Sequence, residues 1–548
     1  MSHHKESRFT PLLLALCLIV GLLIGAFNSN FFSKNELNII NTGSNKLNYL
    51  LQVIDNNYVD TVNINNLIEE AMPQILSELD PHSSYISAKD AAESIEDLKG
   101  SFSGIGISFT IQSDTINIMS VIKGGPSEKV GLMAGDRIIS VNDTAFVGKI
   151  VTNSEAMRRL KGPKDTKVKL GIKRLGEPEP LYFSIVRGNI PVHSVDVSYM
   201  LTPTVGYIKI KNFAEKTYPE MLIALAKLNM EGMQELIIDL RGNRGGLMHA
   251  PIQMANEFLA DNDLILYTEG RRSPREEFRS DGHGAFPTIP LAVLVDEGSA
   301  SSSEIFAGAI QDNDRGTIIG RRSFGKGLVQ QPIEFRDGSI VRLTIARYYT
   351  PSGRCIQKPY PKGHTAEYES DLLTRYERGE FFSQDSIKQD GKAYTTRLGR
   401  TVYGGGGITP DIFVPEDTTG VTSYFKEAVL SGLLQQFAFA YTDSNRKKLE
   451  AFDNVADLTK YLKRQNLLNK FASFAEKRGL RRRNLMLYES RHLFERNLIS
   501  TIIYNAKDML EYIQYLNESD AAVQRAVALF KDQASFPKAP ETPATVAE

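Results

Sequence analysis

The chain has 548 residues, with 64 basic and 65 acidic side chains and a formal net charge of −1. This length exceeds that of one ordinary domain, so several hydrophobic cores are expected. The near-neutral charge and the lack of a basic stripe argue against nucleic-acid binding. The two cysteines, Cys17 and Cys355, provide neither a disulfide framework nor a zinc cluster.

The N-terminus resembles an export or anchoring signal. Lys5 and Arg8 precede an apolar run over residues 11–27, and a basic flank before such a run is typical of a secretion signal or a membrane anchor. The run is slightly shorter than the roughly 20 residues that span a bilayer, and no clear cleavage site follows it. We predict an uncleaved anchor within residues 1–34. A cleaved signal peptide is the main alternative, and a lipoprotein at Cys17 is disfavoured by the bulky residue before it.

Two regions of different character follow. Residues 35–97 are expected to be helical, because Leu47, Leu50 and Ile54 recur at helical spacing. Residues 98–190 contain short runs of alternating apolar residues, separated by Gly and Asn/Asp turns, which predict a small β-rich module.

Strands and helices alternate over residues 191–415, a pattern that predicts an α/β domain. Within it, residues 363–400 are charged and polar and are expected to form a long excursion on the surface. Amphipathic stripes predict a helical region over residues 416–535. Residues 536–548 are rich in Pro, Ala, Thr and Glu and are predicted to be disordered.

A serine-rich loop joins a buried strand at 291–295 to a helix that begins near Ser303. A loop in this position lifts a hydroxyl out of the sheet, and the free N–H groups of the helix can stabilise an oxyanion. The motif is weak alone, because most such loops are ordinary turns and caps.

A lysine between two glycines begins a second candidate segment. Lys326 and Gln330 share one face if the segment is a strand, so the Gln side chain can hold the lysine amine. None of the eight histidines lies in a recognisable triad motif, and His249 is expected to be a local hydrogen-bonding residue. A lysine acts as a base only if burial lowers its pKa, and the apolar neighbours Phe324 and Leu328 favour this.

A glycine-rich turn at 241–246 follows a further buried strand. Its free backbone N–H groups can donate to an oxyanion or hold a substrate backbone. The turn does not match the phosphate-loop pattern, which requires Gly-Lys-Ser/Thr.

Together these segments resemble the carboxyl-terminal processing proteases, also called tail-specific proteases. The resemblance covers roughly residues 45–415 and is specific, because many independent motifs follow the family's order. The motifs are Leu79-Asp80-Pro81-His82-Ser83, Phe102-Ser103-Gly104-Ile105-Gly106-Ile107, Gly131-Leu132 with Gly135-Asp136, Asp239-Leu240-Arg241 with Asn243 and Gly245-Gly246, residues 298–305, Gly325-Lys326-Gly327 with Gln330, residues 348–354, and residues 404–408 with Pro410-Asp411.

The resemblance implies a multidomain α/β fold, with a ClpP/crotonase-like protease core, an inserted PDZ domain and flanking helical regions. It implies a serine endopeptidase in which Ser301 is the nucleophile, Lys326 the general base and Gln330 the residue that orients the lysine. No metal or organic cofactor is needed. The remaining implied positions are Gly245, Gly246 and Ser302 in the oxyanion and substrate loop, Ser299 and Ser303 as structural or capping residues, and Asp312, whose role is less defined.

The β-rich module resembles a PDZ domain, and Gly104-Ile105-Gly106-Ile107 resembles its carboxylate-binding loop. A strand edge with free loop N–H groups can capture the C-terminus of a peptide by β-augmentation. The expected partners are therefore proteins or peptides with apolar C-termini, together with a membrane through the N-terminal anchor. A homo-oligomer or an adaptor is a further possible partner of the helical regions.

These features predict a single-pass protein of the bacterial inner membrane with its catalytic body in the periplasm. The alternative function is a non-catalytic PDZ scaffold on an inactive protease fold. A scaffold has no reason to keep Ser301, Lys326 and Gln330 together, so the enzyme is favoured.

Overall fold

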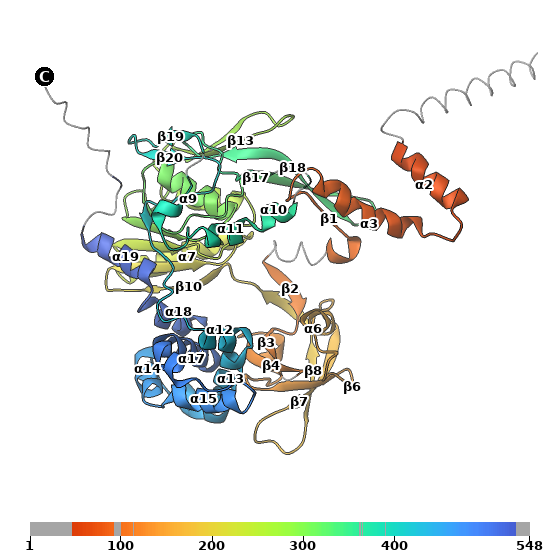
Figure 1. Cartoon of the computed structure of the whole chain (residues 1–548), viewed down its shortest axis with the longest axis vertical. Coiled ribbons are helices and arrows are strands. Elements are labelled where there is room, and N and C mark those ends of the chain that lie inside the picture. Colours follow the sequence, from red (N-terminus) through yellow and green to blue (C-terminus); the bar gives the residue numbers. More distant parts are fainter. Residues whose placement is uncertain are drawn as a thin grey trace, which may run out of the picture. The chain divides into compact units, whose positions relative to one another are not determined.

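The computed structural model describes residues 46–91, 100–112, 114–360, 363, 365–388, 391–532 and 537. The chain divides into two compact units, residues 1–79 and residues 80–548. Helices and strands alternate through much of the second unit (Figure 1), and the predicted multidomain α/β fold class is confirmed.

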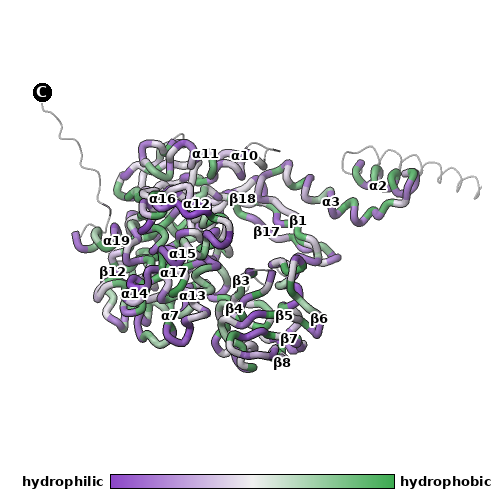
Figure 2. The backbone as a smooth tube through the Cα atoms, turned by 60° about the horizontal axis from the view of Figure 1, so that its bottom comes forward, coloured by the Kyte–Doolittle hydropathy of each residue, from purple (hydrophilic) through white to green (hydrophobic). Residues whose placement is uncertain are grey.

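The first unit contains two described helices, α2 (Lys46–Asn57) and α3 (Ile64–Ser77). Asn63 caps α3, because its side chain accepts the backbone N–H of Asn66 at 3.2 Å. Apolar and polar stretches alternate along both helices (Figure 2), and α2 buries no residue.

The predicted anchor at 11–27 lies outside the described residues. Within the described part of the chain, no helix has both the length and the apolar character to cross a membrane. The longest described helix, α13 (Leu433–Glu450), has 18 residues and carries Asp443, Arg446 and Lys447 in its second half. A spanning helix needs about 20 apolar residues. No described helix thus provides the membrane span that a single-pass inner-membrane protein requires, and the prediction is corrected to that extent.

The β-rich module is a sheet in the order β3-β4-β5-β7-β8, with β6 beside β5 and a separate β2-β9 pair. Its core consists of apolar side chains such as Ile118, Ile138 and Leu170. Among the described strands, β3 has a neighbour on one side only, so its other edge is open to a further strand. The bounds are β2 (Ser101–Gly104), β3 (Ile107–Gln112), β4 (Thr115–Val121), α5 (Pro126–Lys129), β5 (Arg137–Val141), β6 (Thr144–Ala145), α6 (Asn153–Leu160), β7 (Lys167–Lys173), β8 (Leu181–Val186) and β9 (Gly188–Pro191).

The protease-like core is built on a six-stranded sheet in the order β10-β11-β12-β15-β16-β21. The strands from β11 to β21 are parallel, and β10 runs antiparallel to β11. Parallel strands are normally covered on both faces, which explains the continuous apolar runs in the sequence. The bounds are β10 (Val195–Met200), β11 (Val205–Ile210), β12 (Glu235–Asp239), β15 (Leu291–Val295), β16 (Thr317–Gly320) and β21 (Ile412–Phe413).

Different helices cover the two faces of this sheet (Figure 1). Ile238 packs with α7 (Thr217–Met230), α8 (His249–Asn256) and α9 (Ser302–Asp312), whereas the adjacent residue Ile237 packs on the opposite face. That opposite face is covered by α18 and α19, whose buried residues include Ile513, Val523 and Phe530. The helices are α18 (Met509–Asn517) and α19 (Ala521–Lys531). The last two helices thus belong to the core of the α/β domain, although the sequence grouped them with the helical region.

A second sheet has the order β1-β18-β13-β14, with β17 paired to β18. Strand β17 begins two residues after Lys326, so this sheet places the predicted base. The bounds are β1 (Ser84–Ile86), β13 (Leu264–Glu269), β14 (Glu276–Arg279), β17 (Leu328–Glu334) and β18 (Ile340–Tyr349).

The segment after β18 contains short elements and is anchored more firmly than a surface excursion. Arg375 is 1 % exposed and donates to the backbone carbonyls of Arg322 and Ser323. Tyr368 is also buried. The elements are α10 (Thr365–Glu369), α11 (Asp371–Glu377), η1 (Gln384–Ser386), β19 (Ala393–Thr395) and β20 (Thr401–Tyr403).

A helical cluster follows, with its own core around Phe437, Phe471 and Phe494. Apolar and polar stretches alternate along these helices in Figure 2, as expected for helices that bury one face. The bounds of the remaining helices are α12 (Ser423–Leu430), α14 (Val455–Lys463), α15 (Leu467–Glu476), α16 (Asn484–Glu489) and α17 (Arg491–Ala506).

Candidate active site

Ser301 lies between the end of β15 and the first residue of α9, and its backbone has φ 54° and ψ −110°. Positive φ is uncommon for a residue with a side chain and stores strain, a feature that occurs often at functional sites. The backbone N–H of Ser301 donates to Glu304 Oε2 at 2.8 Å, which holds this conformation in place. The loop thus presents a serine at the start of a buried helix.

Lys326 lies just before β17, and its Nζ donates to Gln330 Oε1 at 3.0 Å. Burial lowers the pKa of Lys326, and the positive charge of Arg342 lowers it further. Gln330 Nε2 donates to the carbonyl oxygen of His82. Since the amide nitrogen of Gln330 is engaged there, its oxygen faces the lysine.

The Asp80-Pro81-His82-Ser83 turn before β1 holds the hydrogen-bond partner of Gln330 in place. Asp80 Oδ1 accepts the backbone N–H groups of His82 and Ser83 at 2.9 and 2.8 Å, and it also accepts the hydroxyl of Thr344 on β18 at 3.1 Å. This turn fixes the His82 carbonyl that Gln330 uses. The sequence contained the motif, but nothing in its residue types indicated this support role.

The ring of His82 has a different partner from its carbonyl. His82 Nε2 lies 2.7 Å from the hydroxyl of Tyr368. Burial lowers the pKa of His82 to about 4, and the charge of Lys326 adds to this effect. The imidazole is therefore neutral at ordinary pH and does not line the cavity that contains Ser301.

Glu304 connects the serine loop to the lysine loop. Its carboxylate is fully buried and accepts the backbone N–H of Gly325 at 2.7 Å and that of Lys326 at 2.8 Å, besides that of Ser301. Burial raises the pKa of Glu304 to about 7, although the hydroxyl of Ser323 and the backbone N–H groups act in the opposite direction. The sequence showed Glu304 at a capping spacing after Ser301, but gave no sign of its bonds to the lysine loop.

The glycine turn lies directly against the serine. A Cβ on Gly245 would lie 2.8 Å from the carbonyl oxygen of Ala300 and 2.8 Å from Ser301 Cβ. A Cβ on Gly246 would overlap the carbonyl oxygen of Phe213. Both positions therefore require glycine, because the turn approaches the serine loop too closely for any side chain.

Two backbone N–H groups near Ser301 are available for an oxyanion. Within the described residues, the N–H groups of Gly246 and Ser302 have no hydrogen-bond acceptor. The Ser302 hydroxyl donates to the Gly246 carbonyl oxygen at 3.1 Å, so the two residues are adjacent. Unpaired donors next to a serine are the feature that stabilises a developing oxyanion.

The predicted residues meet at one cavity of about 340 Å³. Ser301, Ser302, Lys326, Gln330 and Gly246 all line it. The rest of its wall is largely apolar and includes Leu247, Met248, Ile305, Leu328 and Val329.

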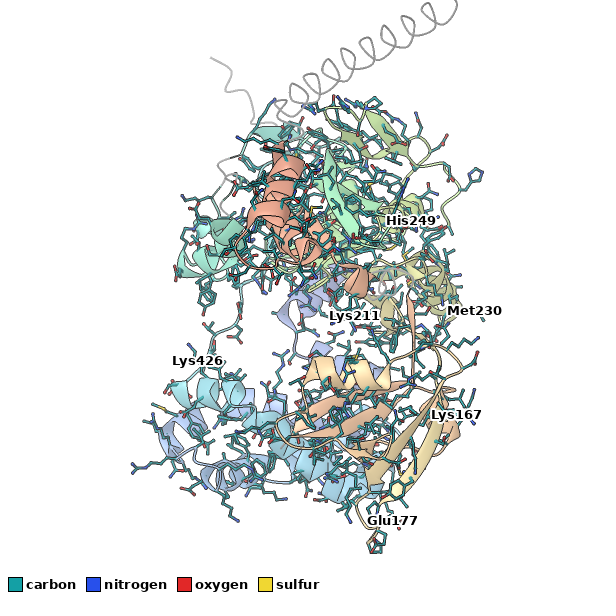
Figure 3. The ribbon with its side chains drawn as sticks, turned by 90° about the vertical axis from the view of Figure 1, so that its right-hand side faces the viewer. Lys167, Glu177, Lys211, Met230, His249 and Lys426 are labelled. Atoms are coloured by element: carbon teal, nitrogen blue, oxygen red, sulfur yellow. The ribbon has the colours of Figure 1, made fainter. Side chains whose placement is uncertain are left out.

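Other predicted residues have structural positions. The hydroxyl of Ser299 donates to the Leu240 carbonyl oxygen at 2.8 Å, and that of Ser303 donates to the Asn243 carbonyl oxygen at 2.8 Å. Asp312 forms a buried ion pair with Arg354 at 2.7 Å. His249 is exposed at the start of α8 (Figure 3).

The predicted peptide loop lies between β2 and β3. Gly104 ends β2 and Ile107 begins β3, while Gly106 has φ +77°, which favours glycine. In the described part of this module, the N–H groups of Ile105 and Gly106 have no backbone acceptor. Free donors at the end of an open strand edge suit the capture of a terminal carboxylate.

Comparison with known protein families matches three regions of the chain. Residues 204–368 match peptidase family S41, residues 94–173 match the PDZ domain, and residues 424–508 match a family of unknown function, DUF8443. The β-rich module is therefore a PDZ domain.

Similar proteins carry consistent descriptions. The chain is 38% identical over 306 residues to a carboxy-terminal-processing protease of Bartonella bacilliformis, covering 55% of this chain and 69% of the relative. It is 35% identical over 346 residues to the carboxy-terminal processing protease CtpA of Bacillus subtilis, covering 63% and 72%. The solved photosystem II D1 C-terminal processing protease is 25% identical, with a TM-score of 0.35, covering 67% of this chain and 91% of that one.

The matched domains define a serine-type peptidase that carries a PDZ domain. The chain belongs to peptidase family S41, the carboxy-terminal processing proteases. The predicted family and enzyme class are thereby confirmed.

Proposed function

We propose that this protein cleaves proteins near their C-termini through a Ser301–Lys326 pair. The observation that carries the proposal is the shared cavity, where a half-buried lysine bonded to Gln330 accompanies a serine of strained backbone. A lysine whose pKa is lowered by burial can be neutral and accept a proton.

In the proposed reaction, Lys326 takes the proton of the Ser301 hydroxyl as its oxygen attacks a peptide carbonyl. The N–H groups of Gly246 and Ser302 stabilise the oxyanion. The protonated lysine then gives its proton to the leaving amine, and a water activated by Lys326 releases the acyl group. The lysine amine is bonded to Gln330 in the described structure, and catalytic hydrogen bonds commonly tighten only when substrate binds.

The PDZ domain recruits the substrate. Its loop at Gly104, Ile105, Gly106 and Ile107 binds the terminal carboxylate, and the open edge of β3 pairs with the peptide backbone. The apolar wall of the catalytic cavity favours an apolar side chain next to the bond that is cleaved.

Proteolysis of an unfolded protein with an apolar C-terminus tests the proposal. The full chain is compared with Ser301→Ala and Lys326→Ala, whose folding is checked by melting temperature. We expect cleavage by the parent and none by either variant. Equal cleavage by all three would exclude the proposed pair. Absence of cleavage together with retained peptide binding would favour the alternative, a non-catalytic PDZ scaffold.

A further inference from the structure

A second cavity, of about 220 Å³, lies where the segment after residue 358 meets the chain before Lys326. Four basic side chains line it, and Asp371 is the only carboxylate among the lining residues. The basic residues are Arg322, Lys358, Arg378 and Lys388.

Two of these cations already have carboxylate partners. Arg322 forms an ion pair with Glu380 at 2.6 Å, and Lys358 forms one with Asp371 at 2.9 Å. In the part of the chain that the structure describes, Arg378 and Lys388 form no ion pair. The cavity therefore has an excess of positive charge.

Glycine backbone forms part of the cavity lining. Gly404, Gly405 and Gly406 line it, and no described residue accepts the N–H of Gly406. Guanidinium, ammonium and backbone N–H groups are together the donors that bind oxyanions. The volume is below the roughly 300–1,000 Å³ of pockets for drug-sized ligands, so a small ligand fits best.

We propose that this cavity binds a small oxyanion of the phosphate class, held by Arg378, Lys388 and the glycine backbone. The two unpaired cations come from residues 369–423, which lie between the segments matched to peptidase family S41 and to DUF8443. The unpaired cations are thus supplied by a segment outside both family matches, whereas Arg322, Phe324 and Lys358 lie within the S41 match.

The wall of this cavity contacts the loop that carries Lys326. Phe324 lines it, and Lys358 Nζ lies 4.1 Å from the centre of the Phe324 ring. The backbone N–H of Lys358 donates to the Gly325 carbonyl oxygen at 2.9 Å, one residue before Lys326. A bound oxyanion steadies this wall and with it the loop that carries the base.

The test uses the full chain with Ser301→Ala, which prevents self-cleavage. Its melting temperature is followed as inorganic phosphate replaces sodium chloride at constant ionic strength. We expect a saturable rise. Adding Arg378→Gln and Lys388→Gln should raise the half-saturating concentration about tenfold or more, the size of one lost charge-assisted bond.

A matched control carries Lys463→Gln and Arg464→Gln, two exposed basic residues of the helical cluster. It should respond to phosphate as the parent does. An equal response of the Arg378/Lys388 variant, or no response beyond that to chloride, would overturn the proposal. Arg378 and Lys388 are both exposed, so their replacement should leave the fold intact. The melting temperature of the variant without phosphate checks this.

Glycerol 3-phosphate distinguishes the source of the oxyanion. A half-saturating concentration equal to that of inorganic phosphate supports the free ion. A clearly lower one supports a phosphate carried as the end group of a larger molecule. Binding of acetate as tight as that of phosphate would contradict the phosphate class.

Discussion

Ser301 and Lys326 donate their backbone N–H groups to the same oxygen atom, Oε2 of Glu304, each at 2.8 Å. The residues are separated by a helix and a strand in the sequence, so this carboxylate sets the relative position of their loops. The hydroxyl of Tyr348 adds a second link, because its one hydrogen is shared between the carbonyl oxygens of both residues. The proposed nucleophile and base are thus held by their backbones, which leaves their side chains free for chemistry.

Replacing Glu304 by Gln should greatly weaken this link. A Gln presents one acceptor oxygen and one donor nitrogen to a site where four donors converge, so buried donors are left unpaired. We expect destabilisation of about 1–3 kcal/mol and a loss of kcat/KM well beyond that of the control. The control is Glu297→Gln, which removes a partly exposed ion pair with Arg321 and should cost up to about 1 kcal/mol. Normal kcat/KM in the Glu304 variant would contradict the positioning role.

The glycine turn offers a matched pair of substitutions. Gly245 and Gly242 both have positive φ, at +96° and +72°, but only Gly245 lacks room for a Cβ. Gly242→Ala should therefore cost only backbone strain, about 1–2 kcal/mol. Gly245→Ala should also displace the serine loop and reduce kcat roughly 100-fold, as loss of an oxyanion donor does. Similar kcat values for the two variants would contradict the close approach of the turn to Ser301.

The pH dependence of kcat/KM should report the neutral lysine. Because burial lowers the pKa of Lys326 below the ordinary 10.5, activity should rise with pH and level off below that value. Arg342→Gln removes a positive charge that disfavours the protonated lysine, so the midpoint should move to higher pH. Arg347→Gln, an exposed residue of the same strand, serves as control. A midpoint that stays fixed or falls in the Arg342 variant would contradict the assignment.

The last two helices, α18 and α19, should be indispensable to the fold. Val523, Ala526 and Phe530 are buried against the sheet, and Asp520 at the N-terminus of α19 forms an ion pair with Arg241 at 2.9 Å. A chain that ends at residue 508 exposes this face, at about 1.5–3 kcal/mol for each large apolar side chain. We expect it to be insoluble and inactive, whereas a chain that ends at residue 532 stays folded. Soluble yield and cleavage activity distinguish the two, and an active shorter chain would refute the packing role.

The sequence predicted the candidate site best where its chemistry is local. The strand, loop and helix around Ser301 and the glycine-flanked Lys326 could be located, because each has a particular residue type at a short spacing, but their catalytic roles were implied only by the family resemblance. The partners of Glu304 and the role of Asp80 could not, since both depend on hydrogen bonds between segments far apart in the chain.

The limits of the fold prediction have a similar cause. Residues 363–400 are polar, so the sequence suggested a solvated excursion, but Arg375 is buried because backbone carbonyls and Glu380 satisfy its guanidinium. Composition does not reveal such pairing. Amphipathic spacing likewise predicts that α19 buries a face, yet it does not indicate which sheet or helix covers that face.

Among the four serines of its loop, Ser301 is the proposed nucleophile, and its reactivity depends on Lys326. The most direct test is reaction of the full chain with a fluorophosphonate, with the modified residue identified by mass spectrometry. We expect one adduct, on Ser301, that forms faster as pH rises and is lost or strongly slowed in folded Lys326→Ala. An adduct on Ser299, Ser302 or Ser303, or labelling of Ser301 at an unchanged rate without Lys326, would contradict it.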